Sequence, residues 1–202
     1  MTKSEMQFAI YTDYYRIGGT EFGFKELLKV WLNRNILAGF RVMYFYRHCI
    51  YAREKNKLLF RFWNRCYRNV SEHYCVELPL DVKIGHGFIF YHANGVVMHP
   101  NAVIGNNCAI LQQVTIGNSG KSRTQVAVLE DGVSVGAGAR LVGPIHIGAY
   151  SSIGANAVVT HDVPENSTAA GVPARILNTN KPNVPLHTDY MSFEEWKERK
   201  NK

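Results

Sequence analysis

The sequence lacks a long apolar run, a secretory leader and any regular pattern of cysteines. No stretch is apolar for long enough to span a bilayer, because Arg41, Arg47 and His48 interrupt the densest run, residues 36–51. The four cysteines form no CxxC pair, zinc-ligand set or disulfide framework by their spacing. These absences predict a protein of a reducing compartment, and we expect a cytoplasmic location.

Net charge is absent from the larger part of the chain. The whole sequence carries a formal net charge of +7, but residues 77–202 contain equal numbers of basic and acidic residues. Residues 1–76 have thirteen Lys and Arg against six Asp and Glu. Such an excess can face an anionic partner or can be the polar side of surface helices. Because aromatic residues are interleaved with it over residues 27–70, we expect a peripheral membrane contact rather than a nucleic-acid partner.

Residues 1–76 predict a small α-helical N-terminal region. Apolar residues recur at three- and four-residue steps in FKELLKVWLNRNIL and in KNKLLFRFWNRCYRNV, which is typical of amphipathic helices. The segment ILAGFRVMYFYRHCIY is more densely apolar, as in a helix buried between others.

From Glu77 onward the sequence repeats with a period of six. Large aliphatic residues stand six apart in two runs, and glycine follows many of them. This period fits short strands joined by tight corners, with the aliphatic side chains pointing inward and glycine relieving the corner backbone. The lead residues are Ile104, Ile110 and Ile116, followed by Leu129, Val135, Leu141, Ile147, Ile153 and Val159. The pattern predicts a parallel β-helix over residues 77–177.

The six-residue period breaks in two places. An earlier set of aliphatic residues, ending at Val96, is offset by two from Met98, so the first break lies within His92–Met98. The second break lies between Ile116 and Leu129, where GNSGKSRTQVA predicts a loop that leaves the scaffold. Because loops on rigid scaffolds often carry function, we expect the two breaks to belong to one site.

Residues 178–202 predict a capping tail. KPNVP is typical of a linker, and SFEEWKERK predicts a short helix with Ser192 as N-cap and Glu195 at the third helical position. We expect this tail to cover the open end of the β-helix, since a bare sheet edge invites aggregation.

Four segments of the repeat region resemble successive motifs of serine acetyltransferases. They are KIGHGFIFYHANGVV, NAVIGNNCAILQQVTIG, VSVGAGARLVGPIHIGAYSSIGANAVVTHDVP and TAAGVPARIL. The resemblance implies a mainly β fold, a left-handed parallel β-helix, with acetyl-CoA as co-substrate and no metal. It also implies a homotrimer with active sites between subunits. The helical region is shorter than in typical members of the family, so we expect a trimer rather than a dimer of trimers.

The resemblance assigns two catalytic residues. His92, in the YHANG turn, corresponds to the family's general base, and imidazole suits the removal of a proton from an acceptor hydroxyl near neutral pH. Glu77 corresponds to an aspartate that orients this histidine, and Asp81 is a second candidate for that role.

Two positions depart from the family pattern and bear on the acceptor. Tyr91 replaces an aspartate, and Gln125 and Val126 replace an arginine–histidine pair whose arginine suits a serine carboxylate. Tyr91 and Gln125 fit a neutral, hydroxyl-rich ring better, because such rings stack on aromatic side chains and bond to amides. We therefore expect a sugar of a surface polysaccharide or its precursor as acceptor, with L-serine as the alternative.

For acetyl-CoA, the resemblance implies a groove lined by backbone and small side chains. Gly117, Ala137 and Ala155 correspond to positions where the pantetheine passes close to the chain, and Lys121, Thr160, His161 and Arg175 are candidates for the phosphate-bearing end.

Two readings from other classes stay open. The spacing of His86, His92 and His99 could serve a zinc site like that of γ-class carbonic anhydrases on the same scaffold. Alternatively, the chain could be a non-catalytic trimeric scaffold, since the second histidine of the family pattern is missing.

Overall fold

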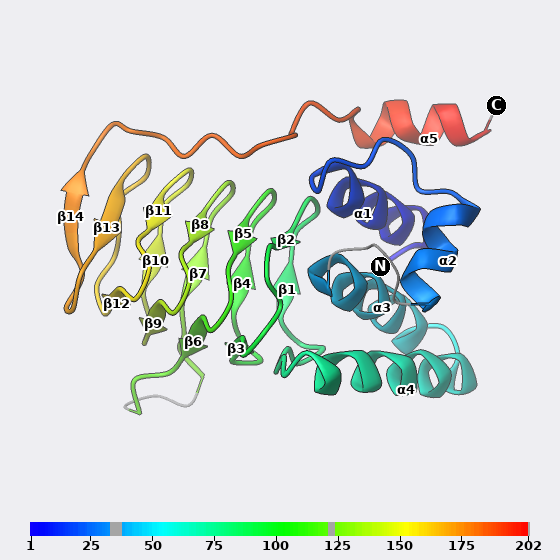
Figure 1. The fold of residues 1–202 in the computed structure, drawn as a ribbon, viewed down its shortest axis with the longest axis horizontal. Coiled ribbons are helices and arrows are strands. Elements are labelled where there is room, and N and C mark those ends of the chain that lie inside the picture. Colours follow the sequence, from blue (N-terminus) through cyan, green and yellow to red (C-terminus); the bar gives the residue numbers. More distant parts are fainter. Residues whose placement is uncertain (33–37, 121–123, 202) are drawn as a thin grey trace.

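A computed structural model describes residues 1–32, 38–120 and 124–201, and it divides into a helical end and a three-sided prism (Figure 1). The helical end contains α1 (Lys3–Tyr15), α2 (Phe24–Leu32), α3 (Ala38–Arg53) and α4 (Lys57–His73). The last three overlap the segments that the sequence predicts as helices. The first was not singled out by its apolar pattern, although Thr2 and Glu5 form a capping box at its start.

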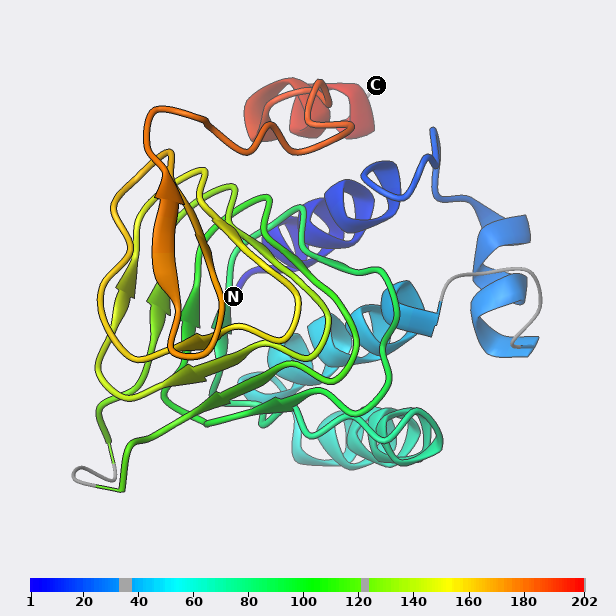
Figure 2. The same ribbon diagram turned by 60° about the vertical axis from the view of Figure 1, so that its left-hand side comes forward.

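The prism is a left-handed parallel β-helix, which makes the fold mainly β with a helical N-terminal region, as the sequence predicts (Figure 2). Its strands are short, and equivalent strands of successive coils pair in parallel. The first sheet contains β1 (Lys83–Ile84), β4 (Val103–Ile104), β7 (Val128–Leu129) and β10 (His146–Ile147). The second contains β2 (Ile89–Phe90), β5 (Ala109–Ile110), β8 (Ser134–Val135), β11 (Ser152–Ile153), β13 (Thr168–Ala170) and β14 (Arg175–Asn178). The third, here named the groove sheet, contains β3 (Val97–Met98), β6 (Thr115–Gly117), β9 (Arg140–Val142) and β12 (Val158–Val159).

The period-six aliphatic residues form the core of the prism. Every lead residue named in the sequence falls within a strand and is buried, and those of successive coils stand opposite one another in register, as Ile116 does with Leu141. A single coil could not bury these side chains by itself, so the stability of each coil depends on its neighbours.

The corners correct the role predicted for glycine. The glycines that follow the lead residues do not take positive φ; that conformation falls two residues later, for example at Gly138 (φ 73°). Gly136 is needed for another reason, since a Cβ there would lie 2.6 Å from the backbone nitrogen of Ala155 in the next coil. Gly105, Gly148 and Gly154 have similar contacts, so these four glycines permit close stacking of coils rather than an unusual backbone turn, whereas Gly117 does not face such a contact.

Both breaks in the period are confirmed by the strand register. Phe90 pairs with Ile110 but Met98 pairs with Ile116, so the chain between β2 and β3 contains two extra residues. The second break is a loop that leaves the prism after β6 and returns at β7 (Figure 1).

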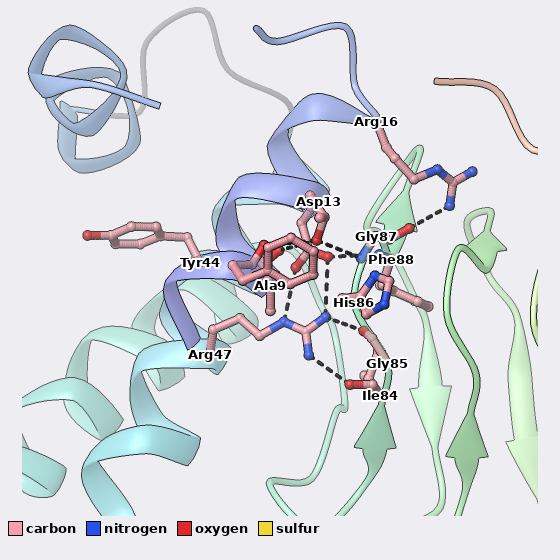
Figure 3. A network of polar contacts seen from close by, with 12 residues as sticks. Ala9, Asp13, Arg16, Tyr44, Arg47, Ile84, Gly85, His86, Gly87 and Phe88 are labelled. Carbon is pink, nitrogen blue, oxygen red and sulfur yellow. Dashed lines mark hydrogen bonds and ion pairs between the residues drawn. The ribbon is translucent and has the colours of Figure 1, made fainter. Parts of the chain in front are cut away.

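A buried ion pair joins the helical end to the first coil of the prism (Figure 3). The Asp13 carboxylate on α1 accepts hydrogen bonds from the Arg47 guanidinium on α3 at 3.0 and 3.2 Å, and both side chains are almost fully buried. Arg47 also donates to the carbonyls of Ile84 and Gly85, while Asp13 accepts from the Phe88 N–H at 2.8 Å. The two charges thus satisfy each other and three backbone groups of the first coil.

The tail corrects the prediction of an end cap. The helix α5 (Phe193–Asn201) is capped by Ser192, whose hydroxyl accepts a hydrogen bond from the Glu195 N–H, as the sequence predicts. However, the chain runs back along the prism, and Trp196 packs on Phe8 of α1 with 5.8 Å between ring centroids (Figure 1). The far end of the second sheet is covered instead by β14, which pairs antiparallel with β13.

The boundaries at residues 76/77 and 177/178 stay predictions. Within the described ranges, no helix has both the length and the apolar character needed to cross a membrane.

Replacing Arg47 by Met should lower the free energy of unfolding by about 3–5 kcal/mol, because it leaves the Asp13 carboxylate buried without its partner. Arg53→Met is a matched control, since Arg53 lies on the same helix and pairs with Asp81 at the surface. That change should cost no more than about 1 kcal/mol. Urea denaturation measures both, and equal losses would contradict the importance of the buried pair.

Candidate active site

His92 lies in the widened corner between β2 and β3, where the first break places two extra residues. Backbone hydrogen bonds hold this corner from both sides: the Gly95 N–H donates to the Cys75 carbonyl at 3.0 Å, and the Gln113 N–H donates to the Asn94 carbonyl at 2.8 Å. The backbone is therefore fixed, while the His92 side chain is exposed to solvent.

The helical end supports the strand that leads into this corner. Gly39 of α3 lies so close to β2 that a Cβ would overlap the Phe90 carbonyl. Phe90 is fully buried and stands two residues before His92. The position of the corner thus depends on the packing of α3 against β2.

Glu77 pairs with the strand that follows the His92 corner. Its backbone bridges to Val97, so Glu77 extends the groove sheet by one position, and its side chain is exposed. Within the described residues, no side-chain hydrogen bond joins Glu77 to His92. Asp81, the second candidate, pairs with Arg53 at 2.8 Å. Glu77 as the orienting carboxylate stays a prediction.

Tyr91 lies at the first break of the six-residue period, and Gln125 and Val126 lie at the second. Tyr91 is half-buried at the start of the His92 corner. Gln125 is exposed where the loop returns to the prism, whereas Val126 is buried. The side chain at position 126 is therefore part of the core, and only position 125 is presented to solvent.

Ala137 and Ala155 lie on the same edge of the prism as the widened corner. The coils stack there through backbone hydrogen bonds, since the Asn156 N–H donates to the Ala137 carbonyl at 2.8 Å and the Gly138 N–H donates to the Gln112 carbonyl at 2.9 Å. Both alanines belong to corners that join the second sheet to the groove sheet. Ala137 and Ala155 therefore lie along the same edge of the prism as His92.

The remaining predicted groove residues lie mostly on the opposite edge of the groove sheet. Gly117 ends β6, and Thr160 and His161 follow β12 with 3.0 Å between the Thr160 hydroxyl and the His161 ring. Arg175 is exposed at the start of β14, and Lys121 falls outside the described residues. The groove sheet is therefore bordered by candidate residues on both edges, with one break of the period at each.

Arg140 is a positive charge on this face that motif comparison does not single out. It precedes the buried Leu141 in β9, and its side chain is exposed on the outer face of the groove sheet. The guanidinium donates to the carbonyls of Gly138 and Gln113, which orient it along the edge that carries the histidine. The repeat could have revealed it, because the residue before each lead aliphatic points outward.

Two of the three histidines of the zinc alternative have other partners. The His86 ring lies 2.9 Å from the Tyr190 hydroxyl, and burial lowers the pKa of His86. The His99 ring accepts a hydrogen bond from the Asn101 N–H at 3.1 Å. Within the part of the chain that the structure describes, no three His, Cys, Asp or Glu side chains come together as a metal-binding group.

Three cavities among the described residues, of about 650, 450 and 470 Å³, are bordered by the helical end, and His92 lines none of these three. Of the candidate site residues that the structure describes, Glu77 alone borders one of these three cavities. It lines the cavity of about 450 Å³ between α4 and the first coil.

Comparison with known proteins places this arrangement in a family. Residues 127–161 match the family model described as bacterial transferase hexapeptide (six repeats). The serine acetyltransferase of Haemophilus influenzae is 41% identical over 152 residues, which cover 74% of this chain and 55% of that protein. A solved serine acetyltransferase in complex with CoA is 32% identical, with a TM-score of 0.69 over 87% of this chain and 71% of that one.

A soybean serine acetyltransferase complexed with serine is 31% identical, with a TM-score of 0.71 over 86% of this chain and 70% of that one. The chain belongs to the serine acetyltransferase-like hexapeptide-repeat family. It spans about half the length of the curated serine acetyltransferases that it matches, 55% in the first case.

Proposed function

We propose that this chain is an acetyl-CoA-dependent O-acetyltransferase in which His92 is the general base. The observation that carries the proposal is the exposed histidine in the widened corner of a β-helix of this family, on the same edge of the prism as Ala137 and Ala155. In the reaction, the acceptor oxygen attacks the thioester carbonyl while His92 takes the hydroxyl proton. Collapse of the tetrahedral intermediate releases the CoA thiolate, which recovers that proton, and the acceptor leaves as an acetate ester.

L-Serine is the acceptor that the comparisons favour over the expected sugar. The curated relatives are serine acetyltransferases, and one solved relative holds serine. In this chain Arg140 offers a guanidinium on the outer face of the groove sheet, toward the edge that carries the histidine, where a carboxylate could be bound. Two observations therefore support serine as the acceptor: the relatives are serine acetyltransferases, and Arg140 of this chain offers a positive charge for the serine carboxylate.

A saccharide hydroxyl is the second candidate acceptor, and the returning loop favours it. Gln125 is uncharged and Val126 is buried, so neither residue supplies a cation for a free carboxylate. A neutral ring would stack on Tyr91 at one edge of the groove sheet or form amide hydrogen bonds with Gln125 at the other.

The end of β6 at Gly117 leaves room for a pantetheine chain to pass close to the backbone. Gly117 does not have positive φ, and a Cβ there would meet only the Thr115 side chain at 3.8 Å. The free space at this edge supports acetyl-CoA as co-substrate. We further propose a homotrimer, in which a second copy forms the other wall of the acetyl-CoA site.

Replacing His92 by Ala should lower the rate of acetyl transfer by roughly 10²–10⁴-fold, the usual contribution of a positioned general base. Release of free CoA, followed by mass spectrometry, measures this rate. His73→Ala is the control, because His73 is also exposed but lies at the end of α4. A His92→Ala variant as fast as the wild type would rule out the proposed mechanism.

Replacing Gly117 by Ala should leave the melting temperature unchanged but raise the KM for acetyl-CoA by roughly 10- to 200-fold, because the added methyl group occupies space in which acetyl-CoA is proposed to pass. Gly136→Ala should instead lower the free energy of unfolding by about 1–3 kcal/mol, because the added Cβ would overlap the backbone of the next coil. An unchanged KM in Gly117→Ala would show that acetyl-CoA does not pass this position.

A further inference from the structure

The helical end exposes a group of large apolar side chains that no element of the described chain covers. On α2, Phe24, Leu28 and Leu32 are 73%, 42% and 60% exposed, and they stand four residues apart on one side of the helix. On α4, Leu58 and Phe62 are 74% and 51% exposed, again four residues apart.

Trp31 and Phe62 join the two helices into one surface. Their rings lie 6.3 Å apart and are stacked, although both remain at least 40% exposed. We name this surface the α2/α4 patch. It consists of Phe24, Leu28, Trp31, Leu32, Leu58, Leu59 and Phe62.

Basic residues border the α2/α4 patch. The two helices together carry six Lys and Arg against two Asp and Glu. Arg61, Arg65 and Arg68 are all exposed and recur at helical spacing on α4, on the side adjoining Leu58. The rest of the chain from residue 77 carries no net charge, so the positive charge is concentrated where the apolar side chains are exposed.

We propose that the α2/α4 patch docks on an anionic lipid surface. Amphipathic helices that lie in a membrane interface combine an apolar face with Lys and Arg beside it, because the apolar side chains enter the acyl boundary while the cations meet the headgroups. A nucleic acid would use the arginines but would leave Leu58 and Phe62 in water. A second copy of the chain would bring two basic surfaces together, which repel each other.

The test is co-sedimentation of the full chain with vesicles at low salt. The wild type should sediment with vesicles of phosphatidylcholine and phosphatidylglycerol, stay in the supernatant with phosphatidylcholine alone, and be released as salt is raised. The double variant Arg61→Gln/Arg65→Gln should partition on the order of 30-fold more weakly, from the contribution of each cation near an anionic surface.

Leu58→Glu should also abolish binding, and it is placed in the first turn of α4, where an acidic residue favours the helix. Matched controls are Val184→Glu, since Val184 is 75% exposed in the tail, and the pair Lys83→Gln/Lys181→Gln. These controls should bind like the wild type.

Three results would overturn the proposal. The first is wild-type protein that stays in the supernatant with anionic vesicles at low salt. The second is Leu58→Glu protein that sediments like the wild type, which would mean that the apolar side chains are not used. The third is a smaller particle mass of Leu58→Glu in solution by light scattering, which would show that a second copy covers the patch.

Discussion

The buried pair of Asp13 and Arg47 is the contact on which the arrangement of the two parts depends (Figure 3). A β-helix must end somewhere, and its first coil presents unpaired backbone groups that would otherwise be open to aggregation. In this chain the two buried charges bind carbonyls and an N–H of that coil. Because an isolated buried charge is costly, the helices and the first coil have to form together.

The packing of the helical end on the first coil also positions the candidate active site, through the strand β2. Gly39 of α3 packs directly on Phe90, and the corner with His92 begins one residue later. The two extra residues that widen the corner are tied by backbone hydrogen bonds to the coils on both sides. The histidine is therefore presented on a rigid scaffold, and the breaks in the repeat, rather than the repeat itself, distinguish this site from the other corners.

Much of the fold could be predicted because one physical requirement repeats itself. Burial of one aliphatic residue in every six determines the strands, and Ile104, Leu141 and Val159 fall where the period places them. The position of the tail could not be predicted in this way. Trp196 packs on Phe8, which lies at the opposite end of the chain, and such a contact leaves no local pattern in the sequence. Likewise, α1 has a capping box but no amphipathic period, since it is buried by partners on several sides.

The site was predictable to a lesser extent. The repeat locates the two breaks, and motif resemblance locates His92, but neither determines whether Glu77 meets the histidine, because one added methylene changes where its carboxylate lies. Lys121 lies outside the described residues, and Arg140 was missed because only the outward positions of the strands reveal it. Position along a scaffold follows from the period, whereas contacts between exposed side chains do not.

The most direct test of the proposed function is to incubate the chain with acetyl-CoA and L-serine as the only acceptor, and to measure free CoA and acetylated product by mass spectrometry. O-acetylserine and free CoA should appear in equal amounts. If the chain binds acetyl-CoA but forms neither product with serine, the assignment of serine as acceptor is contradicted.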